Sequence, residues 1–363
     1  MKKTRHPAKG KRAIFKKIAW AVIGLLLLLA TVIAYDSFFN RSKKVEGTLL
    51  QPDKELKGHT KPLWAVRFSP DDNWIASGGV DGNLQIWQKS NAALVHTLKQ
   101  PMGITTLAFR PDGGAIATGS YDGGIRIWNL ATKSIEKEWT AGKGTVWSVV
   151  WSADGKRLAS GGQDRQVKLW NAATGNLVQA MPGHKLNIWK VRFTPDGKQI
   201  ISSSFDDTIK IWEAGTGTLA RTLAGHSQAV VGLAISADGN TIASASDDKT
   251  IKLWETQSGK LIRTLQGGAE HVYAVAFSPD GKRLVSSNRD RSAIGELVQN
   301  FLGARFYKSN GVTVRLWDVK TGSLLQTSSA HTDDVMDVTI SHDGRWVATA
   351  SDDNTVRLWR LTP

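Results

Sequence analysis

The sequence predicts an all-β fold, a seven-bladed β-propeller of four-stranded antiparallel blades, preceded by one N-terminal transmembrane helix. Three observations lead to this prediction: a unit that ends in tryptophan recurs about every 42 residues, each unit holds four short runs typical of β-strands, and one long apolar run lies near the N-terminus. The 363 residues are 41% hydrophobic and 22% charged, a composition typical of a folded globular chain. The chain has no cysteine, which excludes disulfides, cysteine-based metal sites and cysteine nucleophiles.

The first element is a basic tail, residues 1–17, followed by an apolar segment, residues 18–35. The tail carries eight Lys and Arg and no acid, so it supplies +8 of the net charge of +15. The 18 uncharged residues that follow would reach roughly 27 Å as a helix, close to the thickness of a bilayer core. Because basic flanks stay on the cytoplasmic side, we expect a single-pass signal-anchor in the cytoplasmic membrane. The N-terminus would lie in the cytoplasm and the propeller on the exported, periplasmic side.

This segment has two alternative interpretations. Small residues around Val32-Ile33-Ala34 resemble a signal-peptidase site, so the protein could instead be secreted after signal cleavage. The apolar run exceeds the core of roughly 7 to 15 residues that signal peptides use, which favours the uncleaved anchor. A basic tail can also bind nucleic acid, but the adjacent apolar run already accounts for the charge, so no nucleic-acid partner is expected. A polar linker, residues 36–48, follows the apolar segment.

Residues 49–361 repeat one pattern seven times. In the first copy, an alternating run at 64–68 leads through a Ser-Pro-Asp-Asp turn to a second run at 74–77, then through an Asp-Gly turn to a third run at 84–87 and a fourth run. Short runs separated by Pro, Asp and Gly indicate hairpins, so each copy is a four-stranded blade. The closing tryptophans are Trp87, Trp128, Trp170, Trp212, Trp254, Trp317 and Trp359, spaced by 41, 42, 42, 42, 63 and 42 residues.

The long spacing marks an insert, residues 291–311, between the second and third strands of blade 6. Its apolar residues, Phe301 and Leu302 among them, recur at helical spacing after Ser292, a residue suited to an N-cap. We therefore predict an amphipathic helix. Its apolar stripe either covers the propeller itself or meets a partner or the membrane surface.

These features resemble the WD-repeat β-propeller family over all seven copies, although the closing dipeptide is Trp-Asp only at Trp317-Asp318. The resemblance implies that an N-terminal strand, near Leu49 to Leu56, completes the last blade and closes the ring. It also implies a structural hydrogen-bond network in which an Asp and a Ser or Thr hold a His, and the closing indole completes the chain. The full set recurs in four blades, as His59, Ser77, Asp81 and Trp87; His184, Ser202, Asp206 and Trp212; His226, Ser244, Asp248 and Trp254; and His331, Thr349, Asp353 and Trp359.

The same His, Ser and Asp types occur in hydrolase triads, but four identical buried sites favour a structural role. Acid pairs such as Asp71-Asp72 fall in hairpin turns, and the sequence contains neither a phosphate-binding glycine motif nor His-Glu-x-x-His. We therefore expect no catalytic residue, no metal, no cofactor and no enzymatic activity. If the chain held an ion at the expected channel mouth, His271 and Asp334 would be its candidate ligands.

Two further features concern the blades. Blades 2, 3 and 6 have Gln100, Gly142 and Gly268 in place of the network His, so we expect them to be less rigid. Six third strands carry a basic residue two places before the Trp, which we expect on a solvated strand face spread around the circumference. These residues are Arg126, Lys168, Lys210, Lys252, Arg315 and Arg357.

Two positions vary widely from blade to blade, so the fold does not dictate them: the residue at the entry to the innermost strand and the residue just before the Asp of the turn that follows the second strand. Large side chains accumulate at these positions in blades 1 to 4, and the family resemblance implies that partners bind on this face. We predict a partner-binding patch, since aromatic side chains anchor many interfaces. Its members are Trp64, Tyr121, Trp147, Trp189, Phe205, Tyr273, Met336, Phe301 and Leu302. The alternative is that some of these side chains pack between blades.

The predicted function is a non-catalytic, membrane-tethered platform that binds a protein or peptide through the top face of the propeller. The alternative is an exported propeller enzyme or ligand-binding protein that uses the mouth of the central channel. Because one fold supports many functions, the choice rests on the site.

Overall fold

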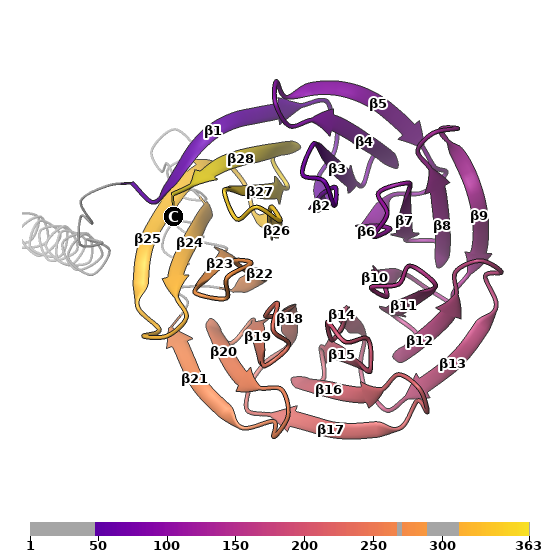
Figure 1. Ribbon diagram of the computed structural model, residues 1–363, viewed down its shortest axis with the longest axis vertical. Helices are drawn as coiled ribbons and strands as arrows, with labels where there is room; N and C mark the ends of the chain where they lie inside the picture. Colours follow the sequence, from indigo (N-terminus) through magenta and orange to yellow (C-terminus); the bar gives the residue numbers. More distant parts are fainter. Residues whose placement is uncertain (1–47, 267–270, 289–311, 363) are drawn as a thin grey trace, which may run out of the picture. The chain divides into compact units, whose positions relative to one another are not determined.

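The computed structural model describes residues 48–266, 271–288 and 312–362. These residues form 28 strands in seven four-stranded antiparallel sheets, which surround a central axis (Figure 1). The predicted seven-bladed propeller is therefore confirmed for the described residues. In each of blades 1 to 6, the four strands follow the chain from the axis outward, so neighbours pair through short connections.

The strands are named by their distance from the axis. The innermost strands, one per blade, are β2 (Leu63–Phe68), β6 (Ile104–Phe109), β10 (Val146–Trp151), β14 (Ile188–Phe193), β18 (Val230–Ile235), β22 (Val272–Phe277) and β26 (Val335–Ile340). The second strands are β3 (Trp74–Gly79), β7 (Ala115–Ser120), β11 (Arg157–Gly162), β15 (Gln199–Ser204), β19 (Thr241–Ser246), β23 (Arg283–Asn288) and β27 (Trp346–Ser351). The third strands are β4 (Asn83–Gln88), β8 (Gly124–Asn129), β12 (Gln166–Asn171), β16 (Thr208–Glu213), β20 (Thr250–Glu255), β24 (Val312–Asp318) and β28 (Thr355–Leu361). The outermost strands are β5 (Ala93–Lys99), β9 (Ser134–Thr140), β13 (Leu177–Pro182), β17 (Leu219–Ala224), β21 (Leu261–Gln266), β25 (Leu324–His331) and β1 (Leu50–Lys57).

The core consists of apolar clusters between neighbouring blades. Trp128 of blade 2, for example, packs with Leu84 and Ile86 of blade 1 and with Ile116 of its own blade. The seven closing tryptophans are at most 5% exposed, and each belongs to such a cluster. A blade cannot bury this large apolar surface alone, so the repeat pattern stabilises a closed ring of blades.

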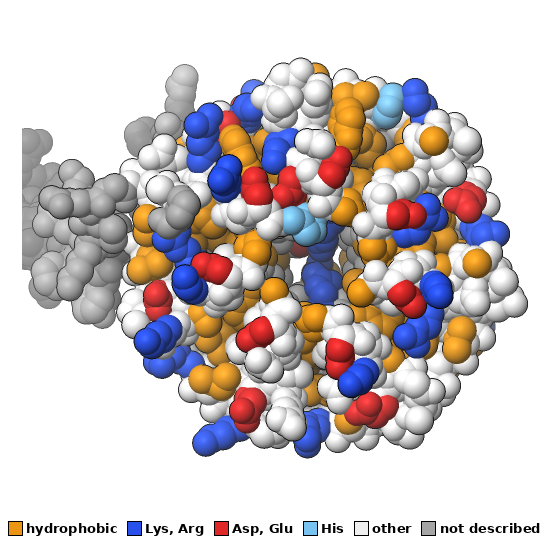
Figure 2. All heavy atoms as spheres, in the orientation of Figure 1, with side chains coloured by type: hydrophobic (Ala, Val, Ile, Leu, Met, Phe, Trp, Pro, Cys, Tyr) orange, Lys and Arg blue, Asp and Glu red, His pale blue; other side chains and the backbone are white. Residues whose placement is uncertain are grey.

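The turns between first and second strands hold most of the acidic residues of one face. In the first such turn, Ser69 Oγ donates a hydrogen bond to Asp71 Oδ1 at 2.5 Å, and the same oxygen accepts the Asn73 backbone N–H at 3.1 Å. Acidic side chains accordingly recur around the ring on the face seen in Figure 2. These carboxylates stabilise turns, which leaves them poorly placed for acid–base chemistry.

The ring closes by pairing the two ends of the propeller. Strand β1 lies antiparallel to β28, with Leu50 opposite Leu361 and Leu56 opposite Val356, so an N-terminal strand completes blade 7 as the sequence predicted. Leu50 and Leu56 are fully buried. Figure 1 shows the indigo strand beside the yellow one. This pairing covers the edge that β28 would otherwise present.

Each innermost strand has a β-bulge at its second residue. In blade 1, Leu63 pairs with Gly79 and Ala65 with Gly78, so Trp64 has no partner in the register. A bulge leaves one residue unpaired and redirects its side chain. The residues skipped in this way are Trp64, Thr105, Trp147, Trp189, Val231, Tyr273 and Met336.

The predicted basic tail, the transmembrane segment, nearly all of the linker and the blade 6 insert lie outside the described residues. Among the residues that are described, no helix has the length and apolar character needed to span a membrane.

Candidate functional site

Five aromatic side chains form one contiguous cluster at the end of the central channel where the innermost strands begin, which we call the upper mouth. Trp147 and Trp189 stack with ring centroids 4.6 Å apart, and Trp64 meets them edge-on at 5.7 and 6.1 Å. Tyr121 contacts Trp147 at 5.9 Å, and Phe205 stacks on Trp189 at 5.2 Å. These five residues are the aromatic cluster. Each is partly exposed, so the cluster is packed within itself and still open to solvent.

The chain positions of these residues explain how they meet. Trp64, Trp147 and Trp189 are bulge residues of β2, β10 and β14, whereas Tyr121 and Phe205 directly follow β7 and β15. None of the five belongs to the interblade clusters of the described residues. The structure thus brings together five of the nine residues predicted for partner binding.

The remaining predicted residues are placed differently. Tyr273 stacks on His271 at a centroid distance of 6.4 Å, and its hydroxyl lies 3.5 Å from Asp334 Oδ2. Met336 is only 9% exposed and offers little surface. Phe301 and Leu302 lie outside the described residues.

The side of the upper mouth formed by blades 5 to 7 is acidic. His271 Nδ1 lies 3.0 Å from Asp247 Oδ1, yet burial raises the pKa of the Asp247 carboxyl. Burial also raises the pKa of the Tyr121 hydroxyl, and the charge of Asp352 adds to the rise. Within the described part of the chain, no group of three His, Cys, Asp or Glu side chains is arranged to hold a metal ion.

The predicted structural network is present as a chain of hydrogen bonds in four blades. In blade 5, His226 Nδ1 lies 2.7 Å from Asp248, Nε2 lies 2.8 Å from Ser244 Oγ, and Trp254 Nε1 donates to the same hydroxyl at 2.8 Å. Blades 1, 4 and 7 have the same contacts around His59, His184 and His331. The hydroxyl-bearing residues Ser77, Ser202, Ser244 and Thr349 are fully buried. No substrate can reach these hydroxyls, so the geometry fits a structural network rather than a hydrolase triad.

Two family models match the chain. One, described as the IFT122 first beta-propeller, matches residues 32–213, which is half of the chain. The other, described as WD domain, G-beta repeat, matches residues 217–255, 259–294 and 322–360. The chain belongs to the WD-repeat β-propeller family. WD-repeat propellers are generally non-catalytic scaffolds that bind protein partners.

Curated relatives match this WD-repeat propeller over short segments. Nuclear distribution protein PAC1-2 of Uncinocarpus reesii is 48% identical over 50 residues, which cover 14% of this chain and 11% of that protein. Protein Mut11 of Chlamydomonas reinhardtii is 45% identical over 42 residues, 12% of this chain and 11% of its own length. Target of rapamycin complex subunit wat1 of Schizosaccharomyces pombe is 42% identical over 50 residues, 13% of this chain and 16% of its own length. The matched segments thus span between 11 and 16% of these relatives.

Other side chains replace the network His in blades 2 and 3 of this WD-repeat propeller. Gln100 is buried and its side-chain oxygen accepts a hydrogen bond from Thr118 at 3.0 Å, while Trp128 Nε1 donates to Thr118 at 3.2 Å. In blade 3, Lys168 Nζ lies 2.5 Å from Asp164 and donates to the Ala141 carbonyl. Each substitute replaces one contact of the missing imidazole, the one to the hydroxyl in blade 2 and the one to the turn Asp in blade 3.

The expectation of a solvated strand face for the basic residues is wrong for blade 2 and for blade 6, where Arg315 is 6% exposed. Arg126 is 4% exposed and pairs with Asp122 at 2.8 Å and with Glu138 at 2.6 Å. Asp122, the turn Asp of blade 2, has no imidazole to bind. The guanidinium of Arg126, two residues before the closing Trp128, therefore pairs with Asp122. The position two residues before the closing Trp is basic in six blades, so the sequence repeat does not reveal that Arg126 is buried.

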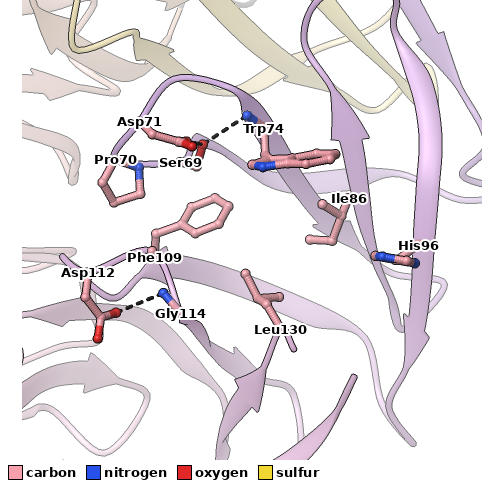
Figure 3. A pocket seen from close by; sticks show the side chains of 11 residues that line it. Ser69, Pro70, Asp71, Trp74, Ile86, His96, Phe109, Asp112, Gly114 and Leu130 are labelled. Atoms are coloured by element: carbon pink, nitrogen blue, oxygen red, sulfur yellow. Dashed lines mark hydrogen bonds between the residues drawn. The ribbon is translucent and has the colours of Figure 1, made fainter. Parts of the chain in front are cut away.

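A pocket of about 420 Å³ lies between blades 1 and 2, on the face that carries the turns between first and second strands (Figure 3). Trp74, Ile86, Phe109 and Leu130 form its apolar walls. The carboxylates at its rim, such as Asp112, accept hydrogen bonds from their own turns. A similar pocket lies between blades 6 and 7, so this hollow follows from the shape of a blade junction.

The sequence interpretation missed two apolar residues beside the aromatic cluster. Met102 and Leu186 are 46% and 50% exposed, and each lies in the loop that leads into an innermost strand. The neighbouring Gly103 lies against the Tyr121 ring, and the Ser204 hydroxyl, next to Phe205 in the chain, donates to the Leu186 carbonyl at 3.2 Å. The sequence signal that could have identified Met102 and Leu186 is an apolar residue two positions before an innermost strand.

Proposed function

We propose that this WD-repeat propeller is a membrane-tethered platform that binds a protein or peptide through its upper mouth. The observation that carries the proposal is the aromatic cluster: five partly exposed rings from blades 1 to 4 in mutual contact. Rigid aromatic side chains grouped at the centre of a face are typical anchors of protein interfaces. Met102 and Leu186 extend the apolar surface at its edge.

The charge around the upper mouth supports a basic and apolar partner segment. Asp247 and Asp352 lie on the side formed by blades 5 to 7, opposite most of the aromatic rings. A Lys or Arg side chain inserted there would meet both carboxylates and the faces of the indoles. Apolar residues next to it would pack on the aromatic cluster.

The tether in this proposal depends on residues 18–35, whose uncharged run and basic flank favour a signal-anchor with the propeller on the exported, periplasmic side. Secretion after signal cleavage is the alternative. Release of the protein from membranes by alkaline carbonate would contradict the anchor.

The test is selection of peptides from a random library on the full-length chain. Selected peptides should carry Lys or Arg next to apolar residues. Replacing Trp147 and Trp189 by Ala should weaken their binding at least tenfold, about 1.4 kcal/mol, because the stacked pair at the centre of the aromatic cluster is lost.

The matched control is Trp346→Ala. Trp346 lies on blade 7 among Lys54, Lys89 and Arg360, away from the upper mouth, so its loss should leave peptide binding unchanged. Melting of each variant is measured in parallel. Unfolding of the double variant would assign Trp147 and Trp189 to the core and contradict the proposal, as would unchanged peptide affinity.

A further inference from the structure

The other end of the central channel, where the innermost strands end, contains a cavity of about 590 Å³. We call it the lower mouth. Its walls come from all seven innermost strands and are mainly apolar and aromatic, with Phe68, Phe109, Trp151 and Phe277 among them. Figure 2 shows the opening at the centre of the disc. A cavity of this volume suits a small organic ligand.

The lower mouth contains more positive than negative charge. Arg67 and Arg192 line the cavity, and its described lining includes no Asp or Glu. Figure 2 shows Lys and Arg side chains, in blue, inside the opening. Because the walls are apolar, the field of these two guanidinium groups is weakly screened.

One acid on the channel wall, Asp337, is already engaged, and Asp72 pairs with His342 of the cavity lining at 2.9 Å. Asp337 is 2% exposed; it forms an ion pair with Arg67 and accepts the Val66 backbone N–H at 3.2 Å. Its other oxygen lies 3.8 Å from Lys190 Nζ. Arg67 of blade 1 and Lys190 of blade 4 therefore share one carboxylate from blade 7.

Arg192 has the least compensated of these charges. Its Nη1 donates to the carbonyl of Val191 at 2.8 Å, and no carboxylate of the described residues lies within 4.0 Å of its guanidinium. Burial lowers the pKa of Arg192 to about 10, and the nearby charge of Arg67 lowers it further, while Asp337 opposes the change. Arg67 is held in the same way, by donating to the Val66 carbonyl at 2.6 Å. The backbone thus fixes both guanidinium groups in place.

We propose that the lower mouth binds a small organic anion whose carboxylate or phosphate group lies between Arg67 and Arg192. Planar guanidinium groups bind both oxyanions through paired N–H donors. The apolar body of the ligand packs against the aromatic walls of the cavity. This site is separate from the upper mouth and does not depend on the function proposed there.

The experiment measures binding of four probes to the full-length chain by calorimetry: benzoate, phenyl phosphate, inorganic phosphate and the neutral benzamide. Benzoate or phenyl phosphate should bind at least tenfold more tightly than benzamide, because only a charged headgroup pairs with the arginines. The tighter of the two identifies the preferred headgroup. Inorganic phosphate alone should bind more weakly than phenyl phosphate, since it lacks the apolar body.

The variant Arg192→Gln should weaken binding of the preferred anion at least tenfold and leave benzamide binding unchanged. It breaks no ion pair, so it should fold. Arg221→Gln, on the exposed outer strand β17, makes the same charge change and is the matched control. Lys190→Met removes a charge that lies outside the cavity lining, so it should weaken binding of the anion less than Arg192→Gln does. Equal affinity of the anion for wild type and Arg192→Gln, or equal affinity of wild type for anion and amide, would overturn the proposal.

Discussion

At the scale of single residues, His226 shows why a repeated His, Ser and Asp set is structural. The imidazole is fully buried, and burial lowers its pKa although Asp248 opposes the change. In the neutral ring, Nδ1 can donate to Asp248 and Nε2 can accept the Ser244 hydroxyl, so both ring nitrogens have buried partners. The network is therefore both a structural element and a site of acid sensitivity.

Replacement of His226 by Ala should lower the free energy of unfolding at pH 7 by roughly 1 to 3 kcal/mol, because Asp248 and Ser244 lose buried partners. The difference from wild type should shrink as pH falls below about 6.5. In that range His226 of the unfolded wild-type chain binds a proton, whereas folded His226, with its lowered pKa, does not. The stability of the wild type therefore decreases as the pH decreases, and the variant lacks this contribution.

The measurement is denaturant unfolding of both proteins between pH 5 and 8. His96→Ala, on the outer strand β5 and outside the network, is the control and should change stability little. Identical stability of wild type and His226→Ala at pH 7 would contradict the structural role of the network.

At the scale of elements, two features govern the molecule: the bulge at the start of each innermost strand and the pairing of β1 with β28. The bulge frees one residue per blade from the ladder, which is why that position varies from Trp to Thr without loss of the fold. Pairing of β1 with β28 makes the first strand of the propeller part of its last blade.

Closure of the ring predicts that Leu56→Ala destabilises the whole propeller by about 2 to 5 kcal/mol, since this fully buried side chain packs with Leu63 and Trp87 between blades 7 and 1. Val95→Ala on β5, at 38% exposure, should change stability by less than about 0.5 kcal/mol. Chemical denaturation followed by tryptophan fluorescence compares them. A Leu56→Ala variant as stable as Val95→Ala would show that β1 contributes little to closure.

At the scale of the whole molecule, the central channel differs at its two ends. The upper mouth carries the aromatic cluster, whereas the lower mouth is an open cavity lined in part by Arg67 and Arg192. Lys190 lies on the wall, where burial lowers its pKa to about 8 and the two arginines lower it further, against the opposing effect of Asp337. A buried cation with so little compensation destabilises the fold at neutral pH.

Lys190→Met should therefore raise the free energy of unfolding at pH 7 by roughly 1 to 3 kcal/mol. The advantage should shrink as pH rises from about 8 toward 10.5, where folded Lys190 has lost its proton while the unfolded chain still binds one, so wild-type stability increases with pH. Asp337 keeps its pair with Arg67 in the variant. Thermal melting across this pH range tests the prediction, with the exposed Lys198→Met as control. A less stable Lys190→Met would show that Lys190 stabilises the fold.

The sequence by itself determined the blades, because their signals are local. Strand alternation, the Ser-Pro-Asp turns and the spacing of the closing tryptophans each lie within about 42 residues and recur, so seven blades and their order could be predicted. The residues of the aromatic cluster could be singled out because they stand at two positions that vary between blades while the rest of the repeat is constant. Their mutual contact could not be predicted, since bulge geometry and channel width decide which rings meet.

Only the tertiary structure decided which charges meet across the channel. Arg67 and Asp337 are 270 residues apart, and Lys190 and Arg192 occupy strand positions that carry Ala, Val or Thr in several other blades. Nothing local marks these residues as a group, because closure of the ring brings blades 1, 4 and 7 to one axis. The same holds for Arg126, whose burial depends on the absence of an imidazole from its own blade. Local periodicity encodes the blade, whereas the long-range closure of the ring creates its candidate sites.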